Sequence, residues 1–268
     1  MTALVTKIVE KPWGKDALPP QFDVPQGKRI GEVWFEPPPA LPDILVKYIF
    51  TSEKLSVQVH PSDAQAEALG ESDRGKEECW LVIDAEPDAV LGIGFTQPLD
   101  TEAMREAALD GSIEGLMQWH PVSTGDFFYI PAGTVHAIGA GVSLIEIQQA
   151  SDITYRLYDY GRPRELHLER GLQVAKGETY SGGTKLSWPE RGAAAIVRGP
   201  YFSADLVSGP TDDGPVPVDH APSIVIPVVG EAIVDGQTVQ AGEAAYASDA
   251  AAVVFGAGSQ CIVVRRPG

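Results

Sequence analysis

Short apolar runs separated by glycine and proline dominate the hydrophobic pattern of the chain. Alternation of apolar and polar positions with a period of two residues is typical of β-strands. Many short strands of this kind predict an all-β barrel or sandwich. The expected strands cover residues 43–50, 55–60, 79–83, 89–94, 127–130, 142–148 and 154–158.

One segment between two expected strands follows a helical pattern instead. Residues 100–111 begin with acidic side chains, continue with alanine and leucine, and end in Gly111. Acidic residues favour the start of a helix and glycine favours its end, and residues 112–118 can add a second helix. We therefore expect a small helical insertion near 98–120. A shorter helix is expected at 62–69, with Ser62 or Asp63 as its N-cap.

Polar side chains share one face of two expected strands. In the segment 55–60, alternation places Ser56, Gln58 and His60 on the same face, opposite apolar residues. The same period groups Lys76 with Glu78 at the start of another strand. These faces contain an imidazole and a carboxylate, which are common metal ligands.

A third polar feature is the stretch 125–136, which has the spacing G-x5-P-x-G-x2-H at every fixed position. Gly125 opens a strand, and Pro131 and Gly133 can shape a tight turn at its far end. The spacing resembles the second signature of the cupin superfamily. This resemblance implies that His136 points into a barrel as a metal ligand.

Several ordered motifs extend this resemblance. The segments above, together with residues 30–34 (IGEVW) and 151–160 (SDITYRLYDY), closely resemble the type I mannose-6-phosphate isomerases (phosphomannose isomerases), in particular their short bacterial form. The resemblance covers roughly the first two thirds of the chain. It implies a fold built of cupin (jelly-roll) barrels and a metal-dependent enzyme of carbohydrate metabolism that interconverts mannose 6-phosphate and fructose 6-phosphate.

The resemblance also implies roles for individual residues. The implied metal is zinc, one divalent ion per chain, although iron, cobalt and manganese use similar ligands. Residue by residue, it implies metal ligation by His60, Glu78 and His136, with Gln58 as a fourth ligand, a catalytic arginine at Arg156, and pocket positions for Lys76, Glu146 and Ser56.

An aldose–ketose isomerase must move a proton between C1 and C2 of the sugar. Glu146 and Lys76 can each serve as the base, and the sequence does not choose between them. Arg156 suits either the enediolate or the phosphate, because a guanidinium can bind oxyanions through two hydrogen bonds. Ser56, Lys76 and Arg156 are the expected substrate-binding residues.

The metal-ligand spacing departs from the generic cupin pattern. That pattern has a second histidine two residues after the first, whereas here Gln58 precedes His60 and Glu78 follows 18 residues later. The departure disfavours a cupin oxygenase. Two further alternatives remain, an isomerase of free aldoses and a non-catalytic cupin that binds a sugar.

An internal repeat appears when the chain is shifted by 117 residues without gaps. Gly125 then falls on Gly242, but His136 falls on Val253 and Glu146 on Val263. We therefore expect a second, degenerate barrel without a metal. The predicted domains are a catalytic, metal-binding cupin with the helical insertion at 1–175, and a linker with the degenerate cupin at 176–268.

The composition and net charge of the chain limit the classes of binding partner that are expected. The 268 residues carry a net charge of −17, which repels nucleic acid and anionic membranes, so a small sugar phosphate is the expected partner. Residues 1–15 have no apolar leader core, and no run reaches the ~18 apolar residues of a membrane helix, so a cytoplasmic location is expected. The sequence leaves the oligomeric state open.

An enzyme of phosphosugars with this charge must gather cations locally. Lys54, Lys76, Arg156, Arg162 and Arg164 all lie in or beside the motifs, with surface loop charge as the favoured interpretation of Arg162 and Arg164. Other expectations concern bulk packing. Trp13, Trp34, Trp80, Tyr155, Cys79 and Cys261 are expected in the core, and His120 and His167 on loops or the surface.

Overall fold

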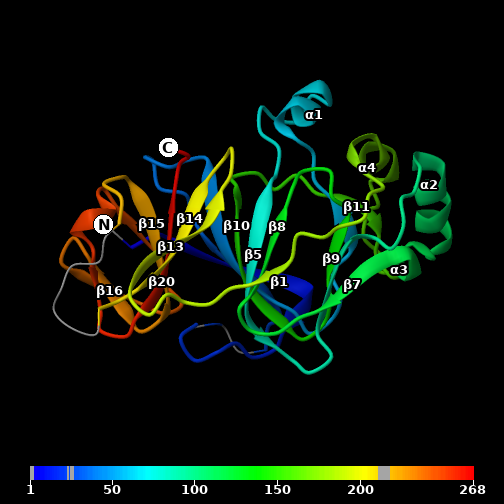
Figure 1. The fold of residues 1–268 in the computed structure, drawn as a ribbon. Helices are drawn as coiled ribbons and strands as arrows, with labels where there is room; N and C mark the ends of the chain where they lie inside the picture. Colours follow the sequence, from blue (N-terminus) through cyan, green and yellow to red (C-terminus); the bar gives the residue numbers. More distant parts are fainter. Residues whose placement is uncertain (1–2, 23, 25–26, 211–217) are drawn as a thin grey trace.

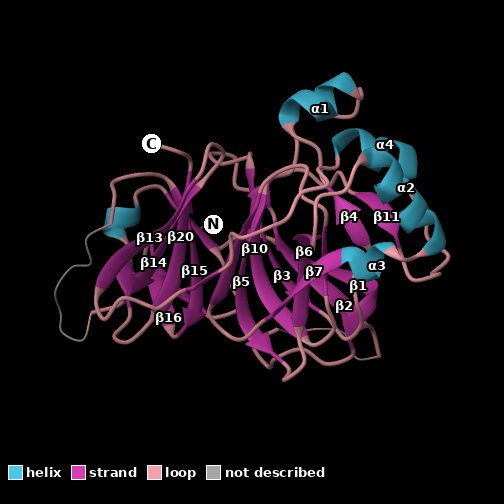
Figure 2. Cartoon of the chain, turned by 45° about the vertical axis from the view of Figure 1, so that its right-hand side comes forward, coloured by secondary structure: helices cyan, strands magenta, loops and turns pink. Residues whose placement is uncertain are grey.

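Antiparallel strands form most of the described chain, and the helices are few and short (Figures 1 and 2). The computed structural model describes residues 3–22, 24, 27–210 and 218–268. Each of the seven expected strands is present, with ends that differ by at most two residues. The β-rich fold expected from the apolar pattern is confirmed.

Two sheets form the part of the fold that carries the sequence motifs. The larger sheet has the order β1 (Thr6–Lys15), β2 (Ile30–Phe35), β3 (Ile44–Phe50), β10 (Val142–Gln149), β5 (Glu78–Ala85), β8 (Asp126–Ile130) and β12 (Thr184–Lys185). The smaller has the order β11 (Tyr155–Tyr158), β4 (Val57–Val59), β9 (His136–Ile138), β6 (Val90–Phe95) and β7 (Met117–Pro121). A shared core that includes Trp80, Leu91 and Ile138 packs between them.

A second pair of sheets follows along the chain. One has the order β13 (Gly192–Arg198), β14 (Ser203–Ser208), β20 (Gln260–Arg265), β15 (Ser223–Val229) and β18 (Ala245–Ala247). The other has the order β17 (Gln237–Gln240), β16 (Glu231–Val234) and β19 (Val254–Phe255), and the short 3-10 helix η1 (Ala250–Ala252) precedes β19. These sheets enclose a core of small and branched apolar side chains, among them Val225, Val234 and Val263.

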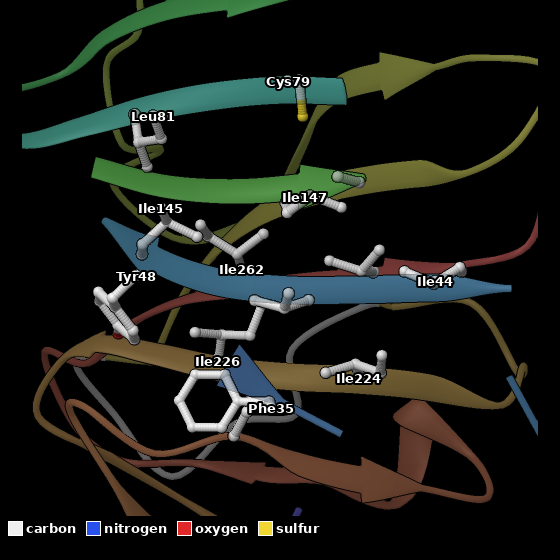
Figure 3. Close-up of a cluster of buried hydrophobic side chains, with 14 of the residues drawn as sticks. Phe35, Ile44, Tyr48, Cys79, Leu81, Ile145, Ile147, Ile224, Ile226 and Ile262 are labelled. Atoms are coloured by element: carbon white, nitrogen blue, oxygen red, sulfur yellow. The ribbon is translucent and has the colours of Figure 1, made fainter. Parts of the chain in front are cut away.

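The two pairs of sheets pack together through the largest apolar cluster of the described chain. Tyr48 and Ile145 from the seven-stranded sheet meet Ile226 and Ile262 from the neighbouring five-stranded sheet (Figure 3). Every residue of β10 is therefore buried, on one face by this cluster and on the other by the first pair of sheets. Because side chains alternate across a strand, Ile145 faces the cluster and Glu146 points the opposite way, into the first pair.

The helices follow local signals. In α2 (Thr101–Asp110), the Asp100 side chain accepts from the Ala103 amide at 2.8 Å, and Gly111 ends the helix at φ 84°. Ser62 caps α1 (Asp63–Ala68), α3 spans Ile113–Leu116, and α4 (Leu168–Val174) was not expected. None of the helices within the described residues is long and apolar enough to span a membrane.

Candidate active site

Three buried side chains from neighbouring strands converge inside the first pair of sheets. His60 follows β4, Glu78 begins β5 and His136 begins β9, and their nearest ligand atoms all lie within 4.8 Å of one another. Glu78 Oε1 lies 3.8 Å from His60 Nε2 and 3.5 Å from His136 Nε2. Motifs that lie far apart in the sequence thus bring their side chains together at one place in the structure.

Backbone contacts orient both imidazoles toward this point. His60 Nδ1 donates to the Ile153 carbonyl at 2.8 Å, and His136 Nδ1 donates to the Thr134 carbonyl at 2.9 Å. Since Nδ1 then carries the proton, Nε2 carries the lone pair in each ring, and it is Nε2 that lies near Glu78 Oε1. Burial and the nearby Lys76 ammonium lower the pKa of both histidines, that of His136 to about 4. Both rings are therefore neutral, which is the form that binds a metal.

The Glu78 carboxylate has one oxygen without a hydrogen-bond partner. Oε2 accepts from Lys76 Nζ at 2.5 Å, whereas Oε1 is fully buried and accepts nothing. Burial and the Glu146 carboxylate raise the pKa of Glu78 to about 7. A buried acceptor left unpaired between two imidazole lone pairs is costly, and a divalent cation would satisfy all three groups at once. The residues present therefore fit a metal ion.

Gln58 lies beside the three ligands on β4. Its Nε2 is 3.3 Å from His136 Nε2, and its Oε1 accepts from Ser56 Oγ at 3.2 Å. The amide oxygen is the atom that binds a metal, so ligation by Gln58 requires a half-turn of its side-chain amide.

A row of alternating charges leads away from this point along the seven-stranded sheet. Lys76 Nζ lies 3.0 Å from His60 Nε2 and 3.9 Å from Glu146 Oε1. Lys47 Nζ lies 3.1 Å from the same Glu146 oxygen, and Trp80 Nε1 donates to the other at 3.1 Å. Burial alone would raise the pKa of Glu146, but the two lysines and these hydrogen bonds lower it to about 2. Glu146 is therefore an ionised carboxylate.

These groups border a cavity of about 370 Å³. Ser56, Gln58, Lys76, Glu146 and Arg156 all line it, as the sequence predicted for pocket members. A cavity of this size, lined by a few convergent polar groups, is typical of a small-molecule site.

Several lining residues were missed or expected elsewhere. Lys47 is the only charged residue in the apolar run of β3, and this interruption was a signal that could have identified it. The expectation for Trp34 is wrong, because its side chain is only half-buried and borders the cavity. Arg164 and His167 lie in the loop after β11, as expected, but both side chains are half-buried and line the cavity instead of facing open solvent. His120 is half-buried in β7. Arg164 was among the cations beside the motif at 151–160, but no pattern in the sequence distinguished it from Arg162, and none marked His167.

Comparisons with known proteins agree with the site. The chain matches no protein-family model. It is 40% identical over 161 residues to the probable mannose-6-phosphate isomerase GmuF of Bacillus subtilis, a match that covers 55% of this chain and 51% of the relative. It is 38% identical over 168 residues to the mannose-6-phosphate isomerase of Streptococcus mutans, covering 60% of this chain and 52% of the relative. The chain spans about half the length of the curated relatives it matches.

Solved structures match over the whole chain. The mannose 6-phosphate isomerase from Bacillus subtilis superposes with a TM-score of 0.82 at 25% identity, over 98% of this chain and 99% of that one. A variant of phosphomannose isomerase from Salmonella typhimurium shares the fold alone, with a TM-score of 0.75, 14% identity and full coverage of both chains. The resemblance of this chain to the mannose-6-phosphate isomerases, expected from its motifs, is therefore confirmed in sequence and in fold.

Proposed function

We propose that the protein is a metal-dependent aldose–ketose isomerase that interconverts mannose 6-phosphate and fructose 6-phosphate. The observation that carries the proposal is the unpaired Glu78 Oε1, buried between two imidazole Nε2 atoms and next to the Lys76–Glu146 pair beside the cavity. The names of the relatives and the match to the Bacillus subtilis enzyme support it. A protein that only bound a sugar would not need acid–base groups beside the metal ligands.

Zinc is the metal we propose, held by His60, Glu78 and His136 and, after a turn of its amide, by Gln58. Catalytic zinc sites use N and O ligands of this kind and leave a position open for substrate. When bound, the ion would polarise the sugar carbonyl and stabilise the negative charge that develops on oxygen.

The charged residues beside the metal ligands, Lys76, Glu146 and Lys47, include the groups that would transfer the proton between C1 and C2 of the sugar. Lys47 and Trp80 fix the Glu146 carboxylate, and its ionised state allows it to accept a proton. Lys76 can hold a proton at a substrate oxygen, or act as the base in place of Glu146. Arg156 contributes a permanent positive charge on the facing sheet, and Ser56 can contact a sugar hydroxyl.

We also propose that the chain contains two cupin barrels, at 1–175 and 176–268, of which only the first is catalytic. The backbone supports the 117-residue repeat, because Gly125 and Gly242 have φ values of 90° and 92°, and Gly141 and Gly258 have values of 75° and 70°. Only glycine adopts such angles readily, so equivalent turns precede equivalent strands. Val253, in the place of His136, packs in the core of the second pair of sheets.

Turnover of two sugars with and without metal tests the proposal. Purified protein should isomerise fructose 6-phosphate, lose this activity after chelation and regain it with zinc. Faster turnover of fructose than of fructose 6-phosphate would favour an isomerase of free sugars. Absence of turnover in protein that still binds metal and sugar would favour a binding protein.

A further inference from the structure

The lysines that line the cavity from the seven-stranded sheet are already paired with carboxylates. These ion pairs are Lys11–Glu32 at 3.2 Å, Lys47–Glu146 at 3.1 Å and Lys76–Glu78 at 2.5 Å. Each pair contributes about zero net charge, so this wall offers little attraction to an anionic group. A phosphate must find its positive charge elsewhere in the cavity.

On the opposite side of the cavity, β11 and the loop after it provide two arginines that have fewer carboxylate partners than these lysines. Arg156, on β11, donates Nη1 to the Glu165 carbonyl at 3.3 Å and forms no ion pair with a carboxylate of the described residues. Arg164 lines the same cavity. Burial and the positive charge of Arg164 lower the pKa of Arg156, although Asp159 and Glu165 act in the opposite direction, so the two cations lie close enough to repel each other. An anion between them would relieve this repulsion.

A buried carboxylate fixes the direction of Arg164. Asp159 is 2% exposed, and it accepts from Arg164 Nε at 2.6 Å and from Arg164 Nη2 at 2.7 Å. This two-pronged contact uses one edge of the guanidinium and leaves its other N–H groups available to a ligand. Arg162 also donates to Asp159, at 3.0 Å, but it does not line the cavity and turns instead to the Lys54 carbonyl.

We propose that Arg164 and Arg156 together bind the phosphate group of the sugar substrate, and that Asp159 is the positioning residue that holds Arg164 toward the cavity. This inference rests on the proposed isomerase function and adds the residues that hold the phosphate group of its substrate. A phosphate monoester carries nearly two negative charges at neutral pH. This charge matches two arginines of which, among the described residues, Arg156 forms no ion pair and Arg164 shares the Asp159 carboxylate with Arg162. Free sugars lack this charge and gain nothing from the pair. The site therefore selects phosphorylated sugars.

The substitution Arg164→Gln tests the inference, with Arg162→Gln as the matched control that touches the same carboxylate. KM for fructose 6-phosphate and the inhibition constant of inorganic phosphate should both rise about tenfold or more in Arg164→Gln, because one charged contact is lost. Its kcat should change less than about threefold, and its metal content and turnover of fructose should stay at the wild-type level. Arg162→Gln should keep the phosphate inhibition constant within about twofold.

Asp159→Asn tests the positioning role separately. It keeps the shape of the side chain and weakens the hold on Arg164, so KM should rise in the same direction but less, while kcat is retained. Should this variant unfold, Arg164→Lys replaces it, because it keeps the charge but cannot make the two-pronged contact and should recover only part of the phosphate affinity.

Two results would overturn the inference. One is an unchanged phosphate inhibition constant in Arg164→Gln, and the other is a loss of phosphate affinity in Lys11→Gln instead, which would move the phosphate to the lysine wall. Calorimetric titration of each metal-loaded variant with inorganic phosphate separates this inference from the proposed function. If wild-type protein binds phosphate through Arg164 but does not isomerise fructose 6-phosphate, the function fails and the phosphate site stands.

Discussion

Replacement of Lys47 by methionine probes the buried charge row most directly. Lys47 is 4% exposed and Glu146 is 3% exposed, and the two are direct partners in the pairing of β3 with β10. Lys47→Met keeps an apolar side chain of similar length, but it removes the ammonium that lies 4.5 Å from the Trp34 ring centroid and leaves the Glu146 carboxylate without its nearest cation. Loss of one member of a buried ion pair costs on the order of 3–5 kcal/mol. We expect about 3 kcal/mol, because Lys76 and Trp80 still face the carboxylate.

Urea unfolding followed by tryptophan fluorescence measures this loss, with zinc present and after chelation. The variant Glu146→Gln and the double variant complete a cycle that isolates the pair, since Glu146→Gln removes the charge that Lys47 compensates. The double variant should be more stable than the sum of the two single losses predicts, by about 2 kcal/mol. Two results together would refute the assignment of Lys47 as the partner that holds Glu146 ionised. The free energy of unfolding of Lys47→Met would fall by less than about 1 kcal/mol, and the losses of the two single variants would add up to the loss of the double variant.

Other expected outcomes concern pH, the second pair of sheets and the catalytic groups. Because the pKa of Glu146 is lowered from 4.5 to about 2, its ion pairs stabilise the fold above about pH 4.5, and the stability difference between wild type and Lys47→Met should shrink as pH falls toward 2. Val253→Ala should lower the free energy of unfolding by about 2 kcal/mol in urea titrations, because Val253 packs in the core of the second pair of sheets. Its metal content should not change. A loss of metal with full stability would contradict the repeat alignment. Glu146→Gln should retain metal yet slow exchange of the substrate C2 proton with solvent in NMR assays, because an amide cannot accept the proton; exchange at the wild-type rate would make Lys76 the base. Arg156→Ala should retain metal, and the fall in its kcat/KM should correspond to a loss on the order of 2–4 kcal/mol of transition-state stabilisation. Full activity in Arg156→Lys would argue against the binding of a substrate oxyanion by Arg156 through two hydrogen bonds.

Local signals predicted most of the elements correctly. The cap at Asp100 and the left-handed Gly111 depend only on neighbouring residues, so the bounds of α2 could be read from the sequence. Alternation also placed Glu78 and Trp80 on the face opposite Cys79. In the structure Trp80 and Cys79 pack in two different apolar clusters, as this alternation predicts. The expected helix over 112–118 ends early, because Met117 pairs with Phe95 in the sheet instead.

Contacts between distant strands could not be predicted. The Lys47–Glu146 pair joins residues 99 positions apart and depends on the register of β3 against β10, which the sequence does not state. The position of Arg164 depends on the buried Asp159, and the burial of that carboxylate arises only when the loop after β11 folds back. Strict alternation over 55–60 places Leu55, Val57 and Val59 on one face, opposite Gln58 and its polar neighbours, but Leu55 precedes β4 and packs in a different cluster.

Metal analysis of wild type and His136→Ala, combined with an isomerase assay, tests the central claim most directly. The matched control is His120→Ala, which removes a half-buried histidine outside the ligand group. Wild type and His120→Ala should each contain about one divalent ion per chain and isomerise fructose 6-phosphate, whereas His136→Ala should lose metal and activity together because only His60 and Glu78 remain as strong ligands. A His136→Ala protein that stays active without bound metal would contradict the account.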